Sequence, residues 1–346
     1  MVTNTPRYYA AFRCLAGACP HTCCAAGWEI PVDPDTSVRY QTLSGPLGER
    51  IRTFVETDPE GVPCFPLRGE SCPFLGQEGL CHIHIQLGEE APPLICRTHP
   101  RFCYDYGPLR ERGLCGSCPE AARLILGENM ELTAGREPGD GEDLPPLLPP
   151  LLKARETALS LLTVENATLS QRLQALLFFA NEVQVLLDDG QTEALPQLCE
   201  FYEEEFPLLS SENLPPRQEV LKKCLCILEG LSILCPQWQE LLSAGKARLG
   251  KPVPLPPHSG ERAAAYFLYR HWLRGAWDED VLSWAEFAVL GTVISAHLSP
   301  CHPESFPETF RQFCQELEHS EDNMAAIQNA LWDKLSLAEM LSVAAW

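Results

Sequence analysis

Apolar residues recur at helical spacing through the second half of the chain. The clearest stripe, at positions i, i+4, i+7, i+8 and i+11 of one helical face, consists of Leu169, Leu173, Leu176, Leu177 and Ala180. Thr168 with Gln171 has the sequence of a capping box, and Gly190 follows the last apolar residue as a C-terminal glycine would. Residues 168–190 therefore predict one complete amphipathic helix.

Similar stripes, separated by Pro or Gly clusters, run through residues 217–245, 261–275, 279–298, 305–318 and 322–344. The strand signal is weak throughout, because leucine and alanine dominate where a sheet would favour valine and isoleucine. The expected fold is mainly α, with six or seven packed helices in the larger domain and no internal repeat of fixed period.

The first part of the chain has a different pattern. Eleven of the 17 cysteines lie between Cys14 and Cys118, no lysine precedes Lys153, and little periodicity is sustained. The segment GREPGDGEDLPPLLPPLL, residues 135–152, combines Gly, Pro and acidic residues that should stop a helix and form a linker. The sequence therefore predicts a cysteine-rich, loop-rich domain at 1–134, a linker at 135–152 and an all-helical domain at 153–346.

Charge and hydropathy exclude several classes of partner. The net charge is −21, and most of it belongs to the helical part, since residues 1–120 carry ten arginines against fourteen acids, about −4. Nucleic acid and anionic membrane are therefore not expected as partners. No apolar run has the length of a signal peptide or of a membrane span of roughly 18 residues. We expect a cytoplasmic protein with reduced thiols, and the odd cysteine count argues against a disulfide framework.

Clustered thiolates in a reducing compartment select zinc, copper(I) or iron-sulfur clusters. The spacing C-x4-C-x3-CC from Cys14 to Cys24, followed by single cysteines, differs from the paired knuckles of structural zinc sites. Neighbouring side chains of an extended chain point to opposite faces, so Cys23 and Cys24 favour different irons or different sites. The number of thiols allows two four-cysteine sites, or one cluster with additional free thiols. The six cysteines after Cys118 fit core positions.

These residues carry a family resemblance. The motifs are Gly27-Trp28, CPFL and LCHI around Cys72 and Cys81, CRTHPR from Cys96, and SCPEAARLIL around Cys118. The eight cysteines that take part are Cys14, Cys19, Cys23, Cys24, Cys72, Cys81, Cys96 and Cys118. From about Tyr8 to Leu126 the chain resembles the flagellin lysine N-methylases, a family related to smaller proteins named for a zinc- or iron-chelating CxxxCxxCC domain. AAAYFLYRHWL, residues 263–273, is similar to an aromatic helix of the same family.

The resemblance implies a bacterial protein that binds metal through these eight cysteines. It implies one or two 4Fe-4S clusters, with zinc as the alternative, and methyl transfer from S-adenosylmethionine to lysine side chains of a protein such as flagellin. Two departures from the family pattern stand out. His99 occupies a position where a tyrosine is expected, and Cys64, Cys103 and Cys115 are additional thiols.

The sequence contains no visible site for the methyl donor. There is no glycine-rich turn of the kind that binds such cofactors in α/β folds. A CxxxCxxC triplet is also missing, since residue 26 is Ala. Arg97 and Arg101 are candidates to bind the carboxylate of the donor or to offset cluster charge, although they equally suit surface ion pairs.

Further candidates come from the aromatic helix and from the cysteine-rich part. Tyr266, Tyr269 and Arg270 could line a donor site between the two domains, or pack in the core. A lysine must lose its proton before it attacks a methyl group, and His99 and Tyr104 are the candidate bases.

Histidines near the cysteines, His21, His82 and His84, are possible ligands or polar surface residues. Two other function classes stay open beside the methylase. One is an iron-sulfur redox or peptide-modifying enzyme. The other is a non-catalytic, zinc-stabilised interaction module.

Overall fold

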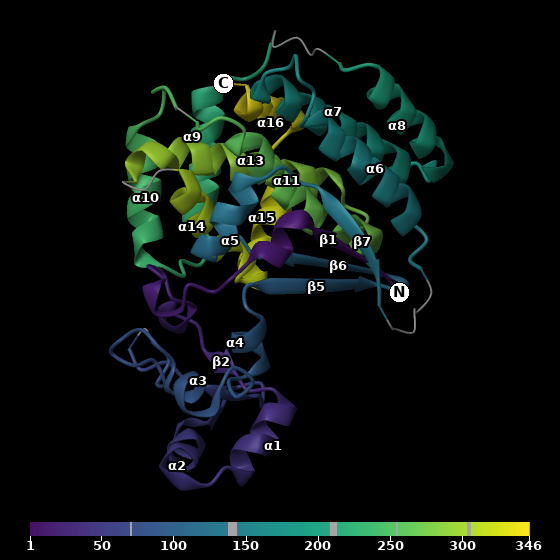
Figure 1. Cartoon of the computed structure of the whole chain (residues 1–346). Helices are drawn as coiled ribbons and strands as arrows, with labels where there is room; N and C mark the ends of the chain where they lie inside the picture. The colour runs from purple at the N-terminus through teal and green to yellow at the C-terminus, as the bar shows by residue number, and fades with distance from the viewer. Residues whose placement is uncertain (70, 138–143, 208–212, 254, 303–305, 346) are drawn as a thin grey trace.

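A helical body and a small lobe make up the molecule (Figure 1). The structure is a computed structural model that describes residues 1–69, 71–137, 144–207, 213–253, 255–302 and 306–345. The expected mainly α fold is confirmed. None of the described helices is long and apolar enough to cross a membrane.

The body is built from helices in chain order. They are α5 (Pro119–Gly127), α6 (Leu148–Leu161), α7 (Leu169–Asp188), α8 (Leu195–Glu204), α9 (Arg217–Glu229), α10 (Pro236–Ala247), α11 (Ser259–His271), α12 (Gly275–Asp278), α13 (Leu282–Leu298), α14 (Phe306–Glu318), α15 (Glu321–Lys334) and α16 (Leu337–Ala344).

Helix α13 is the centre of this body, because every residue from Ser283 to Leu298 is buried. It packs against α7, α11 and α14. Gly291 allows the close approach of α11, since a Cβ atom at this position would lie 2.6 Å from the Phe267 ring. A helix that is apolar on all sides belongs in the interior of a helical layer, and its neighbours supply the amphipathic faces.

The predicted helix at 168–190 is confirmed in detail. Helix α7 begins after Thr168, which forms a capping box with Gln171. Gly190 has a positive φ of 67° just after the helix ends. Two other predicted stripes are each divided between two helices. The stripe at 217–245 breaks before Pro236, and the stripe at 322–344 breaks at Ser336, which starts α16 with a second capping box.

Part of the expected linker is helical. Residues 138–143 lie outside the described part of the chain, but α6 begins at Leu148 within the segment expected to stop helices. Pro149 and Pro150 occupy its first turn, where a missing N–H costs no helical hydrogen bond. The division into domains at this linker stays a prediction.

A four-stranded sheet covers one side of the body. Its order is β5 (Arg101–Tyr106), β6 (Leu109–Leu114), β1 (Val2–Pro6) and β7 (Leu132–Arg136), with β1 and β6 parallel and the other pairs antiparallel. The weak strand signal did not predict this sheet. β1 reads VTNTP, without the β-branched apolar alternation of a typical strand, and backbone pairing with distant segments holds it in place.

The small lobe has a hydrophobic core of its own. It contains β2 (Ile30–Pro31), α1 (Pro34–Thr42), α2 (Gly45–Phe54), β3 (Glu56–Thr57), β4 (Pro63–Phe65), α3 (His82–Leu87) and α4 (Leu94–Thr98). Phe65 and Phe74 are fully buried in this core and pack with ring centroids 4.7 Å apart. The four-stranded sheet and α5 instead share the core of the helical body. Residues from about 28 to 99 therefore fold around one core, and the segments on both sides fold around another.

A buried ion pair joins the sheet to the helices. The Arg155 guanidinium on α6 donates to the Glu111 carboxylate on β6 at 2.5 and 2.6 Å, and both side chains are 2 % exposed. Removing one partner leaves a buried charge without compensation. We therefore expect Glu111→Gln to lower the free energy of unfolding by about 3–5 kcal/mol, measured by urea denaturation.

The exposed pair of Arg7 and Glu131 provides the matched control. Glu131→Gln should change the free energy of unfolding by less than about 1 kcal/mol, because solvent screens exposed pairs. Equal effects of the two substitutions would contradict this account of the sheet.

Candidate metal centre between the lobe and the helical body

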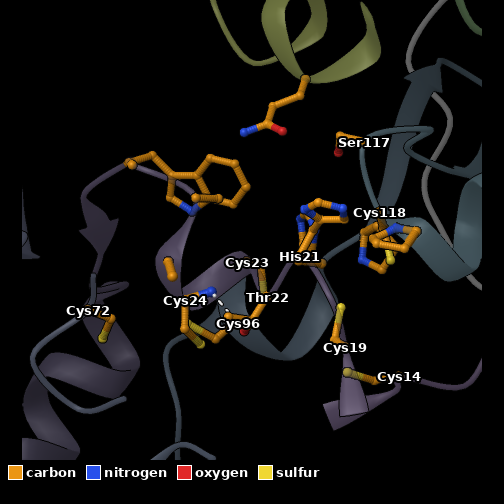
Figure 2. Close-up of a pocket in the computed structure, with 18 of the residues that line it drawn as sticks. Cys14, Cys19, His21, Thr22, Cys23, Cys24, Cys72, Cys96, Ser117 and Cys118 are labelled. Carbon is orange, nitrogen blue, oxygen red and sulfur yellow. Dashed lines mark hydrogen bonds between the residues drawn. The ribbon is translucent and has the colours of Figure 1, made fainter. Parts of the chain in front are cut away.

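A cavity of about 1520 Å³ lies between the small lobe and the helical body. All eight cysteines of the sequence motif line it: Cys14, Cys19, Cys23, Cys24, Cys72, Cys81, Cys96 and Cys118. They come from the segment that enters the lobe, from the lobe itself and from the start of α5. Figure 2 shows Cys72 on one side, Cys14, Cys19 and Cys118 on the other, and Cys23, Cys24 and Cys96 between them.

The thiols on the lobe side affect one another. The Cys72 N–H donates to the Cys24 carbonyl at 2.8 Å, which fixes these two segments side by side. Burial raises the pKa of the Cys96 thiol, and the charges of Cys24, Cys72 and Cys81 raise it further. Cys24, Cys72, Cys81 and Cys96 therefore form one group, the lobe-side thiols.

A second group lies toward α5. Burial raises the pKa of the Cys118 thiol, and the charges of Cys19 and Cys14 add to this effect. Cys23 interacts with members of both groups: its hydrogen bond with Cys24 and its burial raise its pKa, and the charges of Cys96 and Cys14 raise it further. We call Cys14, Cys19, Cys23 and Cys118 the body-side thiols.

Burial, and then repulsion between neighbouring thiolates, raises the pKa of most of these thiols, whereas the hydrogen bond with Cys23 lowers the pKa of Cys24 to about 7. A bound cation reverses the increase, since metal ligands must be deprotonated. The chemistry of the donor set therefore suits a thiophilic metal. In the described part of the chain, however, no group of three or more Cys, His, Asp or Glu side chains has an arrangement that could hold a metal ion. Iron-sulfur binding thus stays a prediction.

A polar stripe of α14 forms another wall of the cavity. Arg311, Gln312 and Gln315 line it. The Arg311 guanidinium donates to Glu308 at 2.6 and 2.8 Å and to Gln315 at 2.6 Å, and all these side chains are buried. The Gln312 Oε1 atom is buried and has no hydrogen-bond partner among the described residues. One face of α14 carries positions 308, 311, 312 and 315. None of these residues was among the candidates predicted from the sequence.

A hydrogen-bonded network lies behind the cavity. Gly116 brings the loop before α5 against α14, since a Cβ atom there would lie 2.6 Å from the Cys314 Sγ. The Ser117 Oγ, in a residue that lines the cavity, is 2.6 Å from the His319 Nε2 and 3.1 Å from the Cys115 Sγ. The Cys115 thiol in turn donates to the Glu318 Oε2 at 3.6 Å. Sequence analysis named Cys115 only as an extra thiol and missed Ser117, Glu318 and His319.

His99 lines the cavity beside the aromatic residue Trp28. The two rings have centroids 5.8 Å apart, and His319 lies 4.8 Å from Trp28. Burial lowers the pKa of His99 to about 4, and the charges of His319 and Arg270 lower it further. His99 is therefore neutral near pH 7.

The two candidate arginines also line the cavity, each with partners of its own. Arg97 donates to the Glu90 carboxylate at 2.8 Å, and the Arg101 guanidinium lies 4.9 Å from the centroid of the Phe12 ring. Of the candidate histidine ligands, His21 and His84 line the cavity, whereas the His82 Nδ1 lies 3.0 Å from Arg50.

The remaining candidates lie away from this cavity. The Tyr269 hydroxyl lies 2.9 Å from the Arg112 carbonyl oxygen and 3.2 Å from that of Asn4 and can donate its hydrogen to either, so it ties α11 to the sheet. Tyr266 and Arg270 are buried in the network around Glu318. Tyr104 and Arg270 line a second cavity of about 440 Å³. The two candidate bases, His99 and Tyr104, are thus not brought into one cavity.

The other cysteines divide into several environments. Cys199, Cys224 and Cys314 are buried as expected for core positions. The expectation is wrong for Cys226, which is exposed, and for Cys235 and Cys301, which line the large cavity. Cys64 is buried on β4, and Cys103 is exposed on β5.

Comparison with known proteins shows which class of protein the chain resembles. Residues 155–274, from α6 to the turn after α11, match the FliB lysine N-methylase C-terminal domain. Because this match includes α11, it supports the similarity of the aromatic segment that the sequence indicated.

Three curated relatives agree with this class. The Lysine-N-methylase of Salmonella typhimurium is 26 % identical over 209 residues, 57 % of this chain and 52 % of the relative. The Lysine-N-methylase of Salmonella choleraesuis is 27 % identical over 212 residues, with the same coverage. The flagellar biosynthetic protein FliU of Salmonella muenchen is 26 % identical over 143 residues, 40 % of this chain and 84 % of the relative.

The chain spans about half the length of the two lysine-N-methylases that it matches. No solved structure matches it. The resemblance predicted from the sequence is confirmed, since the chain is similar to FliB-type lysine N-methylases.

The neutral state of His99 predicts a pH dependence of stability. Its pKa is about 4 in the folded chain and near 6.5 when unfolded, so between these values the unfolded chain takes up the proton. The free energy of unfolding should therefore fall as the pH falls from about 6.5 to about 4. In His99→Gln this decrease should be smaller, as measured by urea denaturation across the range. His84→Gln, which changes an exposed histidine, should keep the wild-type decrease. A His99→Gln profile parallel to wild type would contradict the buried neutral imidazole.

Proposed function

We propose that the chain is a metal-dependent protein lysine N-methyltransferase that takes methyl groups from S-adenosylmethionine. The observation that carries this proposal is the convergence of all eight motif cysteines on one cavity. The names of the relatives support the reaction, because two are lysine-N-methylases and a third is a flagellar biosynthetic protein. A protein with accessible lysines, such as flagellin, is the proposed substrate, and the cytoplasm is the proposed location.

The proposed metal is iron, held in two iron-sulfur clusters. The lobe-side thiols Cys24, Cys72, Cys81 and Cys96 would hold one cluster, and the body-side thiols Cys14, Cys19, Cys23 and Cys118 the other. This division assigns the vicinal pair to different clusters although both cysteines lie in one 3-10 turn, because the Cys96 thiol is affected by Cys24 together with Cys72 and Cys81. When bound, such clusters supply redox-active metal centres, whose potentials depend on burial and on hydrogen bonds to sulfur.

The chain's own residues can orient a methyl donor in the same cavity. A sulfonium cation is attracted to an aromatic face, and Trp28 presents its ring beside His99. The carboxylate of the donor would pair with Arg97 or Arg101, both of which line the cavity. The unpartnered Gln312 Oε1 is an additional acceptor for a donor amine or hydroxyl group.

The lysine substrate must be neutral when it attacks the methyl group, because an ammonium group has no lone pair. His99 is neutral through burial and can accept a hydrogen bond in the cavity, which makes it the proposed orienting residue there. The lobe has a hydrophobic core of its own around Phe65 and Phe74, which buries side chains without any metal. This core argues against a module that is stabilised by zinc alone.

Iron content tests the two sets of thiols. The anaerobically isolated chain should be brown and contain about eight irons, since four thiolates hold each 4Fe-4S cluster. Cys72→Ser and Cys118→Ser should each remove about half of the iron, because each change disables one set of ligands. Iron, sulfide and zinc analysis measures this directly.

Cys103→Ser is the matched control, since Cys103 is exposed on β5 and does not line the cavity. It should keep the full iron content. A colourless protein with stoichiometric zinc would refute the iron-sulfur proposal.

A methyl-transfer assay tests the reaction. With labelled S-adenosylmethionine and flagellin, the iron-loaded wild type should label lysine. The rate of Cys118→Ser should be at least about tenfold lower, because disturbing the surroundings of a metal centre costs about 10- to 100-fold in activity. Cys103→Ser should retain the wild-type rate. If Cys72→Ser and Cys118→Ser lose iron and keep full activity, the metal-dependent site is wrong.

A further inference from the structure

The second cavity, of about 440 Å³, is lined by residues of the helical body and of its sheet. Tyr104 of β5, His271 of α11, Asp278 of α12, Trp284 of α13 and Glu321 of α15 line it, and Glu318 at the end of α14 also contributes. None of the motif cysteines belongs to its lining, so its chemistry is separate from that of the thiols.

His271 offers an unused hydrogen-bond acceptor here. Its ring is 2 % exposed, and the Nε2 atom lies 2.8 Å from the Glu318 Oε1. Burial alone would raise the pKa of Glu318, but the charge of Arg270 and the hydrogen bond from His271 lower it to about 2. Because an ionised carboxylate can only accept, the Nε2 atom must carry the hydrogen.

The other ring nitrogen therefore has a free lone pair. Burial lowers the pKa of His271 to about 4, so the ring is neutral and Nδ1 carries no hydrogen. Nδ1 is buried and has no hydrogen-bond partner within the described ranges. A buried acceptor without a partner is costly, and a ligand that donates a hydrogen bond would satisfy it.

The charges around the cavity favour a cation. Its lining contains three carboxylates against two guanidinium groups. Both guanidinium groups are engaged: Arg270 lies 3.1 Å from Glu318, and Arg274 lies 4.7 Å from the centre of the Trp284 ring. Among the lining carboxylates, Asp278 and Glu321 are exposed, and Asp278 also accepts hydrogen bonds from Trp284 Nε1 at 3.0 Å and from Gln328 Nε2 at 3.1 Å.

The walls also suit a short aliphatic chain. The Trp284 ring is stacked on His271 with centroids 5.5 Å apart and planes at 18°. Tyr104 and the apolar side chain of Met324 contribute further lining. An apolar stem with a hydrogen-bonding cationic tip matches these walls, since the methylenes would contact the rings while the tip reaches Nδ1.

We propose that the second cavity binds a primary ammonium group on an aliphatic stem, and that its ligand is a lysine side chain of the protein substrate other than the lysine that receives the methyl group. The assignment of this lysine to the protein substrate rests on the proposed methyltransferase function. The ammonium group donates to His271 Nδ1 and is attracted by Asp278 and Glu321.

Glu318 connects this lysine cavity to the thiol cavity. Its Oε1 accepts from His271, and its Oε2 accepts from the Tyr266 hydroxyl at 2.7 Å and from the Cys115 thiol at 3.6 Å. Cys115 in turn contacts Ser117, which lines the thiol cavity. One hydrogen-bonded network therefore links residues of the two cavities.

Fluorine NMR of the full chain labelled with 5-fluorotryptophan tests the binding. The Trp284 resonance is assigned with Trp284→Phe. Nα-acetyl-lysine N-methylamide should shift this resonance, whereas the norleucine analogue, which has the same stem without the ammonium group, should not. Glu321→Gln should raise the dissociation constant of the lysine compound about 3- to 10-fold, because one attracting charge near the solvent is lost.

Asp322→Asn is the matched control, since Asp322 is exposed in the same first turn of α15 and does not line the cavity. It should keep the wild-type dissociation constant. The proposal would be overturned if the lysine and norleucine compounds shifted the Trp284 resonance equally, or if Glu321→Gln and Asp322→Asn changed the dissociation constant equally. It would also be overturned if acetate shifted the Trp284 resonance and the lysine compound did not.

The test also separates the cavity from the reaction. If the lysine compound binds as expected and no methyl transfer occurs, the proposed function fails and the lysine cavity stands. If methyl transfer occurs and the lysine compound leaves Trp284 unchanged, the lysine cavity is wrong and the proposed function stands.

Discussion

The buried carboxylate of Glu318 determines how the loop that carries Cys115 meets α11 and α14. Its side chain is completely buried at the end of α14, between Arg270 and His271 of α11 and the loop that carries Cys115. Tyr266 extends the contact, because its hydroxyl donates to Glu318 and accepts from the backbone N–H of Gly116. A charge this deeply buried is stable only with several partners, so these segments must assemble together.

The contacts of this carboxylate fix the position of the loop that borders the thiol cavity. The loop from Cys115 to Cys118 lies against α14, and it supplies both Ser117 at the cavity surface and the last motif cysteine. The other cysteines arrive from the lobe and from the segment that precedes it. Lobe and body thus contribute thiols to the same space, and any ligand held by both groups would couple their relative positions.

Local features of the fold were predictable from the sequence, and features made by distant contacts were not. Helix α7 carries its periodicity, its capping box and its terminal glycine within one short segment. β1 has no such signal, because its pairing with β6 joins residues far apart in the chain. The breaks before α10 and α16 were missed because the apolar pattern continues across them.

The same distinction applies to the site. The cysteines were identifiable as candidate ligands because thiols have few other reasons to cluster. The polar face of α14, with Arg311 and Gln315, has the spacing of an ordinary solvent-exposed face, and only the packed structure shows it buried. His271 was not identifiable as a site residue, since nothing near it in the sequence indicates that Glu318 orients its ring.

The central claim is that the eight cysteines act together as metal ligands in the cavity between lobe and body. X-ray absorption spectroscopy of the anaerobically isolated full chain, at the iron and zinc edges, tests it most directly. The account predicts iron surrounded by sulfur, with iron–iron scattering from polynuclear clusters and no stoichiometric zinc. Zinc in tetrahedral coordination, or iron with only oxygen and nitrogen neighbours, would contradict it.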